Sequence, residues 1–469
     1  MITAVSSVSL NANTCRFSGS NGSPGEPSPE GTLAQPASAA ASARTIMRRV
    51  PALPRSGVSR NGDPARIAPR LLHSSTQRME PLPMTGEIMH TLGLACVALA
   101  ALGCVHALAA AARVRRFRGQ GEPALASFPG VTILKPLHGA EAGLDQNLAS
   151  FCEQDYRGPV QIVFGAHDAR DPALGVVEQL IASYPGRDLE LRITGASRGP
   201  NPKVANLIGM QPAIRHDIVV IADSDIAVPP DYLSRTVAAL GAPGVGLVTY
   251  LYRGEVRGGI WARLAAMAID YHFLPDVLIG LALGLARPCF GATIALKRDT
   301  LAAIGGFDAF VAHLADDNAI GEAVRRAGLS VTIPPLVVRH TCAEQSAREL
   351  LRHELRWART LRAASPWGYA GLALTHPLPF AILATLLWGR ALPGALMIAA
   401  AIACRLVLQV QVDHTLGVRS KSGWLGPARD LLAFGVHFAS FFIGVVSWRG
   451  HRYKVRADGT LVPLGEHRT

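Results

Sequence analysis

One uninterrupted apolar segment constrains this chain more than any other feature. Residues 88–112 contain no Lys, Arg, Asp or Glu, and a helix of that length can cross a bilayer. Four arginines follow directly, namely Arg113, Arg115, Arg116 and Arg118. Because positive residues favour the cytoplasmic side, the segment predicts a transmembrane anchor that leaves the next domain in the cytoplasm. The order argues against a cleaved signal peptide, whose basic region would precede the apolar run.

The overall composition fits a protein that is part membrane and part globular. Hydrophobic residues make up 49% of the 469 residues, which is high for a soluble enzyme and low for a bundle of spanning helices alone. The net charge of +12 would also fit a nucleic-acid-binding protein. Much of that charge lies in an Arg-bearing N-terminal stretch and beside apolar segments, without aromatic interleaving, so we expect no nucleic-acid partner. The seven cysteines have no CxxC spacing, so we expect reduced thiols and no zinc site.

The first 83 residues predict no packed domain. Residues 1–83 are rich in Ser, Ala, Pro and Gly, with nine arginines and no lysine. Such a segment buries too little apolar surface to fold, so we expect a disordered extension. An organelle transit peptide is a second interpretation. An over-extended gene start is a third, and we favour it because Met84 or Met89 would begin the protein just before the apolar segment.

Residues 128–365 predict a globular α/β domain. Helical stretches such as 173–183 and 231–240 separate short runs that are rich in β-branched residues. These candidate strands lie at 131–137, 160–166, 189–194, 217–223 and 245–250. The alternation is typical of a parallel sheet with crossover helices.

Aspartates follow the candidate strands at the place where an α/β sheet binds its ligands, beyond the carboxyl ends of the strands. Asp168 follows the second run, and Asp223 and Asp225 lie at the end of the fourth. Two carboxylates on one short turn can hold a divalent metal, and the metal can hold a diphosphate. A D-x-D triplet alone is a weak signal, because aspartate is common at strand ends and turns.

Two further motifs follow the acidic turn. Asp316 and Asp317, in LADDN, lead into an amphipathic helical stretch. In RHELRW (352–357), His353 lies one helical turn from both Arg356 and Trp357, so the three side chains can share a helix face. Each motif alone has an ordinary structural explanation. Their order on an α/β scaffold beside membrane segments indicates an enzyme site.

Apolar segments also lie within and after the α/β domain. Residues 259–286 are broken by charged residues and predict either a helix pair on the membrane surface or a core helix. We assign residues 366–448 to C-terminal membrane helices and 449–469 to a basic tail. Within the first range, 368–389 and 391–412 can cross, with Arg405 facing inward or snorkelling, and 431–448 is a shorter candidate. Three crossings would put the basic tail opposite the catalytic domain, so one segment is expected to be re-entrant or interfacial.

These motifs together resemble those of the ceramide glucosyltransferase family of inverting, membrane-bound glycosyltransferases, and most closely its bacterial relatives that glycosylate hopanoids. The resemblance runs from Pro129 to Val455. Its most specific stretches are PGVTILKPLHGAE (129–141), NPKVANL (201–207), IADSD (221–225), LADDN (314–318), RW (356–357) and SWRGHRYKV (447–455). It implies a GT-A (Rossmann-like) glycosyltransferase domain with an N-terminal anchor and C-terminal transmembrane or interfacial helices.

The resemblance assigns the donor side of the site to residues near the strand ends. Asp168 matches the first aspartate of the family pattern, which contacts the nucleotide, and Asp171 is its neighbour in the same loop. Lys203 of NPK is expected to approach the diphosphate. Asp223 and Asp225 match the metal-binding acidic motif, which would hold Mg²⁺ or Mn²⁺.

The resemblance assigns the chemistry to later motifs. Asp317 matches the catalytic base, with Asp316 beside it. Arg356 and Trp357 match the RW of a Q/R-x-x-RW motif that lines the diphosphate and acceptor region. His353 stands where that motif has Gln or Arg, so its charge near pH 7 is left open. The same departure argues against a processive polysaccharide synthase, where Gln is expected.

The implied function is transfer of a sugar from a UDP-sugar to a membrane lipid alcohol, with inversion because one base gives a single displacement. The Ala/Arg-rich, lysine-poor composition and a short basic loop favour a bacterial inner-membrane protein, with a hopanoid polyol such as bacteriohopanetetrol as acceptor and UDP-N-acetylglucosamine as donor. Ceramide with UDP-glucose is the alternative. A non-catalytic membrane scaffold is the non-enzymatic alternative, and the joint presence of all the motifs argues against it.

Overall fold

The computed structural model describes residues 83–195, 199–418, 422–442, 445–448, 451–455 and 460–463. The three interpretations of the N-terminal extension concern residues outside the described ranges. Arg449 and Gly450 of the SWRGHRYKV stretch also lie outside the described ranges.

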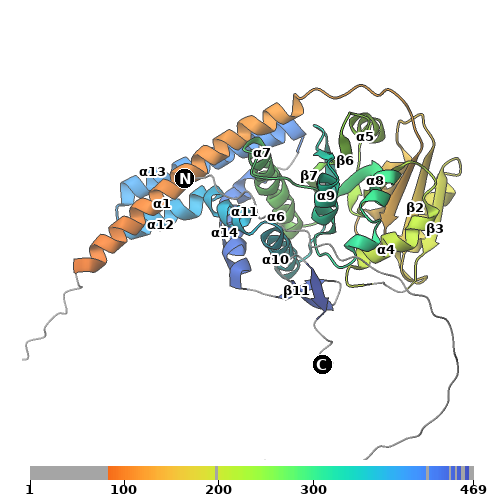
Figure 1. The fold of residues 1–469 in the computed structure, drawn as a ribbon. Coiled ribbons are helices and arrows are strands. Elements are labelled where there is room, and N and C mark those ends of the chain that lie inside the picture. Colours follow the sequence, from red (N-terminus) through yellow and green to blue (C-terminus); the bar gives the residue numbers. More distant parts are fainter. Residues whose placement is uncertain are drawn as a thin grey trace, which may run out of the picture. The chain divides into compact units, whose positions relative to one another are not determined.

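The α/β domain is built on a seven-stranded sheet of order β3-β2-β1-β4-β8-β6-β9 (Figure 1). The strands are β1 (Val131–Pro136), β2 (Val160–Ala166), β3 (Asp188–Ile193), β4 (Ile218–Ala222), β6 (Val245–Thr249), β8 (Thr293–Lys297) and β9 (Ser330–Thr332). All five candidate strands are confirmed, and the helical stretches 173–183 and 231–240 form α3 (Ala173–Ser183) and α5 (Tyr232–Leu240).

The expectation of a wholly parallel sheet is wrong at β8. Strands β1 to β4 pair in parallel, but β8 runs antiparallel to both of its neighbours, β4 and β6. β8 follows a long apolar helix and a loop, and it was not among the candidate strands of the sequence. The resulting mixed sheet places the residues before β8 beside the end of β4, where Asp223 N donates to Ala292 O.

A second, three-stranded sheet of order β5-β10-β7 lies at the carboxyl end of β4. It consists of β5 (Ile226–Ala227), β7 (Leu251–Val256) and β10 (Val337–Cys342). The short strand β5 continues directly from the acidic turn, and its Ile226 pairs with His340 of β10. The sequence analysis did not predict this sheet, which joins residues more than a hundred positions apart.

β1 and β4 are buried on both sides, because helices cover both faces of the large sheet. One core contains residues of α2 (Leu144–Cys152), α3 and α5. The other contains residues of α4 (Pro202–Met210), α8 (Arg298–Ala303) and α9 (Asp316–Arg326). Short 3-10 turns lie at Gln211–Ala213 and Asp308–Phe310.

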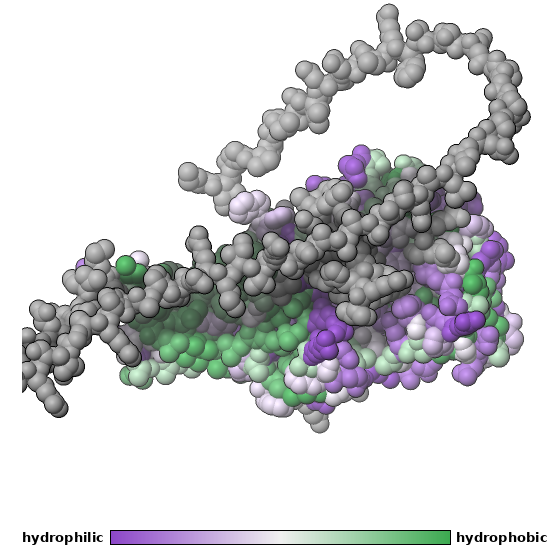
Figure 2. All heavy atoms as spheres, turned by 90° about the horizontal axis from the view of Figure 1, so that it is seen from below, coloured by the Kyte–Doolittle hydropathy of each residue, from purple (hydrophilic) through white to green (hydrophobic). Residues whose placement is uncertain are grey.

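The remaining helices are largely apolar except for α10, which is rich in arginine and glutamate. They are α1 (Pro83–Arg118), α6 (Ile260–Ala268), the π-helical turn η2 (Ile269–Phe273), α7 (Leu274–Ala282), α10 (Ala347–Ala364), α11 (Pro366–Gly371), η4 (Leu372–Thr375), α12 (Pro377–Trp388), α13 (Ala391–Leu416), η5 (Gly423–Leu425) and α14 (Gly426–Phe442). Exposed apolar side chains such as Leu102, Leu386 and Leu396 gather over α1, α12 and α13 (Figure 2).

Three helices of the described residues are long and apolar enough to cross a membrane: Gly86–Arg118, Ile260–Ala282 and Ala391–Leu416. A fourth candidate is the pair Pro366–Thr375 and Pro377–Trp388, bent by 65°. The expected pair of surface helices at 259–286 is one helix that runs through the π turn and packs against α1 and the second sheet. Arg405 of α13 faces inward and is 4% exposed.

The chain after α14 forms strands where the last part of the 431–448 segment was predicted to continue as an apolar helix. α14 ends at Phe442, and residues 445–448 form β11 (Val445–Trp448). β11 pairs with β12 (His451–Val455), which pairs with β13 (Leu461–Pro463). The β-branched pair Val445 and Val446 favours a strand over a helix once the hairpin partner is present.

Candidate functional site

The acidic turn after β4 is fixed by its neighbours on both sides. β4 is fully buried, and Asp223 follows its last residue. The buried Lys135 of β1 donates from its Nζ to the carbonyl of Asp223, and its ammonium lies 4.0 Å from the ring centre of Phe151. Burial lowers the pKa of Lys135 to about 7, against the attraction of the acidic turn. Lys135 was not predicted from the sequence, because a single lysine in an apolar strand does not indicate which residues its ammonium contacts.

Lys203 connects the acidic turn to the second pair of aspartates. It lies in the first turn of α4, whose N-cap Asn201 accepts from Val204 N. Lys203 Nζ lies 2.6 Å from Asp223 Oδ1 and 3.8 Å from Asp316 Oδ2. Burial disfavours the charged lysine, but Asp223 and Asp316 outweigh it and raise the pKa of Lys203. The sequence prediction that Lys203 lies near the diphosphate-binding acids is consistent with this position.

Asp317 is held at the N-terminus of α9 by two backbone amides. Its Oδ2 accepts from Gly291 N at 2.7 Å, and its Oδ1 accepts from Asn318 N at 2.7 Å. A Cβ at position 291 would lie 3.1 Å from Asp317 Oδ2 and 3.3 Å from Lys203 Nζ, so a side chain there would displace these two groups slightly. Burial and the neighbouring Asp316 raise the pKa of Asp317 to about 6. A carboxylate with such a pKa is suited to accept a proton near neutral pH.

Asp225 pairs with a histidine that the sequence analysis did not identify. His340 Nε2 lies 3.2 Å from Asp225 Oδ2. Burial opposes both charges, but their attraction outweighs it, raising the pKa of His340 and lowering that of Asp225 to about 2. The other oxygen, Asp225 Oδ1, is buried and has no hydrogen-bond partner among the described residues. Burial also raises the pKa of Asp223, against the opposing charge of Lys203.

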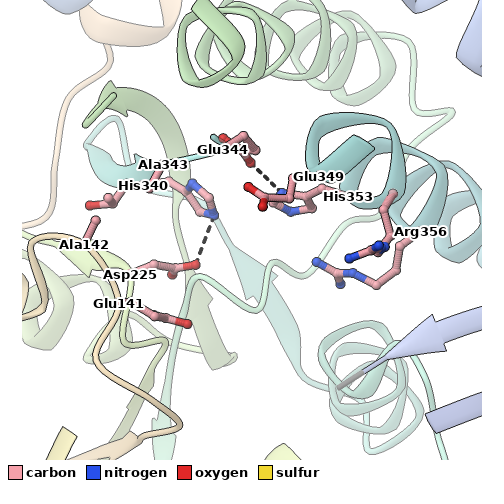
Figure 3. Close-up of a pocket in the computed structure, with 11 residues that line it drawn as sticks. Glu141, Ala142, Asp225, His340, Ala343, Glu344, Glu349, His353 and Arg356 are labelled. Atoms are coloured by element: carbon pink, nitrogen blue, oxygen red, sulfur yellow. Dashed lines mark hydrogen bonds and ion pairs between the residues drawn. The ribbon is translucent and has the colours of Figure 1, made fainter. Parts of the chain in front are cut away.

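Helix α10 carries the RHELRW motif to the opposite side of a pocket (Figure 3). His353 Nδ1 lies 2.7 Å from Glu344 Oε1, and its ring contacts Trp357 edge-on, with centroids 4.6 Å apart. Burial lowers the pKa of His353, although Glu344 opposes the shift.

The pocket between α10 and the acidic turn has a volume of about 370 Å³. Its lining residues are Glu141, Ala142, Asp225, His340, Thr341, Ala343, Glu344, Glu349, Arg352, His353 and Arg356. Figure 3 shows Arg356 reaching into the space that faces Asp225 and His340. Trp357 lies behind this wall, where it contacts Tyr252 and His340.

Asp168 and Asp171 lie apart from this pocket. They line a second pocket of about 360 Å³ with His138, His167, Arg170, Pro172 and Pro202. Asp171 accepts from Gly139 N and Ala173 N, so it fixes the loop, whereas Asp168 accepts only from Arg170 N among the contacts described. The first turn of α4 separates the two pockets, because Pro202 lines one and Lys203 reaches the acidic turn beside the other.

The residues of the acidic turn fit a divalent cation. Asp223 and Asp225 supply hard carboxylate oxygens, and the unpartnered, buried Asp225 Oδ1 needs a positive or hydrogen-bonding partner. No group of three or more His, Cys, Asp or Glu ligands is present in the described residues. Two protein carboxylates are nevertheless the usual share for Mg²⁺ at a phosphate site, where substrate oxygens and water complete the coordination.

Comparison with known proteins places these motifs in a family. The sequence profile of Glycosyl transferase family 21 matches residues 95–461. Ceramide glucosyltransferase 1 of Caenorhabditis elegans is 24% identical over 379 residues, which are 78% of this chain and 80% of that protein. An N-acetylglucosaminyltransferase of Mesorhizobium japonicum is 24% identical over 250 residues, which are 51% of this chain and 57% of that protein. A mannosyltransferase structure from Pyrobaculum calidifontis, in complex with GDP-Man and Mn²⁺, has a TM-score of 0.42 and 21% identity, covering 75% of this chain and 99% of that one.

Proposed function

The chain belongs to glycosyl transferase family 21, and from this premise we propose that it transfers a sugar from a UDP-sugar to a membrane lipid alcohol with inversion. The observation that carries the proposal is one arrangement of charges. Lys203 lies between Asp223 of the acidic turn and the aspartate pair of α9, and Asp317 has its pKa raised to about 6. Family membership also supports the predicted GT-A class of the α/β domain.

In this mechanism the chain's own residues perform three tasks. Asp317 accepts the proton of the acceptor hydroxyl while the oxygen attacks the anomeric carbon from the side opposite the leaving diphosphate. Lys203 and Arg356 present positive charge to the diphosphate as its negative charge increases. Asp168, in the second pocket, contacts the nucleotide. A single displacement with one base inverts the anomeric configuration.

Asp223 and Asp225 would hold Mg²⁺ or Mn²⁺, which supplies Lewis-acid stabilisation of the departing diphosphate. The unpartnered Asp225 Oδ1 supports this assignment. His340, which is buried and paired with the other Asp225 oxygen, fixes the orientation of the carboxylate.

The acceptor is a lipid alcohol in this proposal because three candidate spanning helices belong to the same chain as the site. We favour a hopanoid polyol such as bacteriohopanetetrol, with UDP-N-acetylglucosamine as donor, in a bacterial inner membrane with the α/β domain on the cytoplasmic face. The likeness to an N-acetylglucosaminyltransferase is compatible with that donor. Ceramide with UDP-glucose is the second candidate, and the likeness to ceramide glucosyltransferases favours it.

An exchange of donors and acceptors on one membrane preparation tests the proposal. Membranes that contain the protein receive UDP-glucose or UDP-N-acetylglucosamine with either ceramide or bacteriohopanetetrol, and the lipid products are identified by mass spectrometry. We expect an N-acetylhexosamine on the hopanoid. Hexosyl-ceramide would move the assignment to the second candidate with the same mechanism. If neither lipid gains a sugar with the unaltered protein, and its membranes give the same products as the Asp317→Asn membranes, the acceptor assignment is wrong.

A further inference from the structure

Helix α10 has two faces that differ in character. Glu349, Arg352, His353 and Arg356 line the pocket. On the other face, Leu350 and Ala358 are 1% and 7% exposed, and the helical spacing places Glu354 between them. An apolar residue would be the ordinary choice at that position. The glutamate there forms an ion pair within a packed interface.

The partner of Glu354 is Arg429 of α14, which is 3% exposed. Arg429 forms a two-pronged pair with both carboxylate oxygens of Glu354, with the Nη2 to Oε2 distance at 2.9 Å, and it donates to the carbonyl of Leu264 in α6. A second contact joins the same two helices, where Arg362 of α10 donates to the carbonyl of Ser440. α14 therefore contacts α10 at its middle and near its C-terminal end.

Asp430, the next residue of α14, forms an ion pair with a different helix, α13. Asp430 is 2% exposed and accepts from Nε of Arg405, in α13, at 3.0 Å to each of its oxygens. His272 of the π turn lies 3.2 Å from Asp430, and Arg405 also donates to the carbonyl of Tyr271 at 3.0 Å. Two adjacent residues thus link the pocket helix α10 to the apolar helix α13.

We propose that Arg429 and Asp430 are positioning residues, which together fix the pocket helix α10 relative to the apolar helices α13 and α6–α7. A buried ion pair contributes little net stability compared with apolar packing, but it specifies one arrangement of the helices that it joins. Arg356 and His353 lie within two residues of Glu354 on the same helix. A shift of α14 against α13 would therefore move the wall of the pocket that faces Asp225.

The inference rests on the proposed function for its effect on nucleotide binding, so the experiment includes a readout that is independent of nucleotide. Asp430→Asn breaks the contact with α13 and does not touch α10. Asp413→Asn is the matched control, because Asp413 is an acid of α13 that accepts from Tyr271 Oη at 2.6 Å without involving α14. Amide hydrogen exchange of residues 347–364 and the dissociation constant of UDP with Mn²⁺ are measured for each protein in lipid nanodiscs.

We expect Asp430→Asn to speed exchange in α10 and to weaken UDP binding about fivefold, while Asp413→Asn changes neither. Equal exchange in α10 for the two variants would overturn the inference. If the unaltered protein does not bind UDP, the proposed function is wrong, and the exchange of α10 alone decides the positioning role.

A second variant covers the case in which Asp430→Asn does not fold. Arg405→Leu with Asp430→Leu removes both charges and leaves none uncompensated. We expect this double variant to fold and still to show faster exchange in α10 than Asp413→Asn. Exchange in α10 at the unaltered rate would show that the ion pair is only a local structural contact.

Discussion

Buried charges occur in two parts of this molecule and are arranged in opposite ways. In the helical part, two buried acids lie against arginines, Asp430 against Arg405 and Glu354 against Arg429. At the site, four aspartates lie at two chain positions, 223–225 and 316–317, with Lys203 shared between the two groups. One oxygen, Asp225 Oδ1, has no partner among the described residues.

The paired charges of the helical part stabilise one helix arrangement, whereas the excess of carboxylates at the site can bind a cation or accept a proton. A pair of opposite charges carries no excess charge with which to bind an ion, and it resists change because removal of one partner leaves a buried charge. Burial and the neighbouring Asp316 raise the pKa of Asp317, and the excess of carboxylates leaves a demand for a cation. The two arrangements therefore predict opposite responses to substitution.

The largest expected effect is on turnover at the site. Asp317→Asn removes the base without changing the size of the side chain, and we expect turnover to fall about a thousandfold while UDP binding is kept. Mass-spectrometric quantification of the glycosylated lipid and UDP titration measure the two quantities. Asp308→Asn, nine positions earlier, is the control and keeps full activity. Turnover within tenfold of the unaltered protein would remove Asp317 from its role.

The next effect concerns the stability of the helical part. Asp430→Leu leaves Arg405 without its acid, and we expect a loss of about 3–5 kcal/mol in the free energy of unfolding. Combining it with Arg405→Leu should recover most of that loss, because no charge is then left unpaired. Unfolding followed in detergent by intrinsic fluorescence gives both values. A double variant as unstable as the single one would contradict the balanced-pair description.

The third effect is on metal binding at the acidic turn. Asp225→Asn should weaken Mn²⁺ binding roughly 10–100-fold, as read from the free-ion signal in electron paramagnetic resonance with UDP present. Removal of the metal by a chelator should abolish turnover, and added Mn²⁺ should restore it. Asp231→Asn, on a surface position that pairs only with Arg235 among the contacts described, serves as the control. Unchanged Mn²⁺ affinity in Asp225→Asn would place the metal elsewhere.

The smallest effect is the pH dependence. Asp317 must be ionised to accept a proton, and its pKa is raised to about 6. Turnover should therefore be constant above that value and fall about tenfold per pH unit below it. An aspartate with an ordinary pKa of about 3.9 would leave turnover flat down to pH 5. A flat profile between pH 5 and 7 would show that the excess of carboxylates does not act on Asp317.

The sequence predicted the strands and the position of three aspartates at strand ends, because both follow local rules. Runs of β-branched residues mark β1, β2 and β4, and Asp168, Asp223 and Asp225 follow the ends of β2 and β4. It did not predict His340, Lys135 or the antiparallel direction of β8. His340 reaches Asp225 only through the pairing of β10 with β5, which are far apart in the chain. Arg405 was expected to face inward or to snorkel, but its partner Asp430 depends on how α14 packs.

The first turn of α4 contributes a residue to each side of the site. Pro202 lines the pocket of Asp168, while Lys203 contacts the acidic turn beside the pocket of Asp225. A ligand that contacts both pockets would have to pass this turn, so Pro202 and Lys203 would lie along its path.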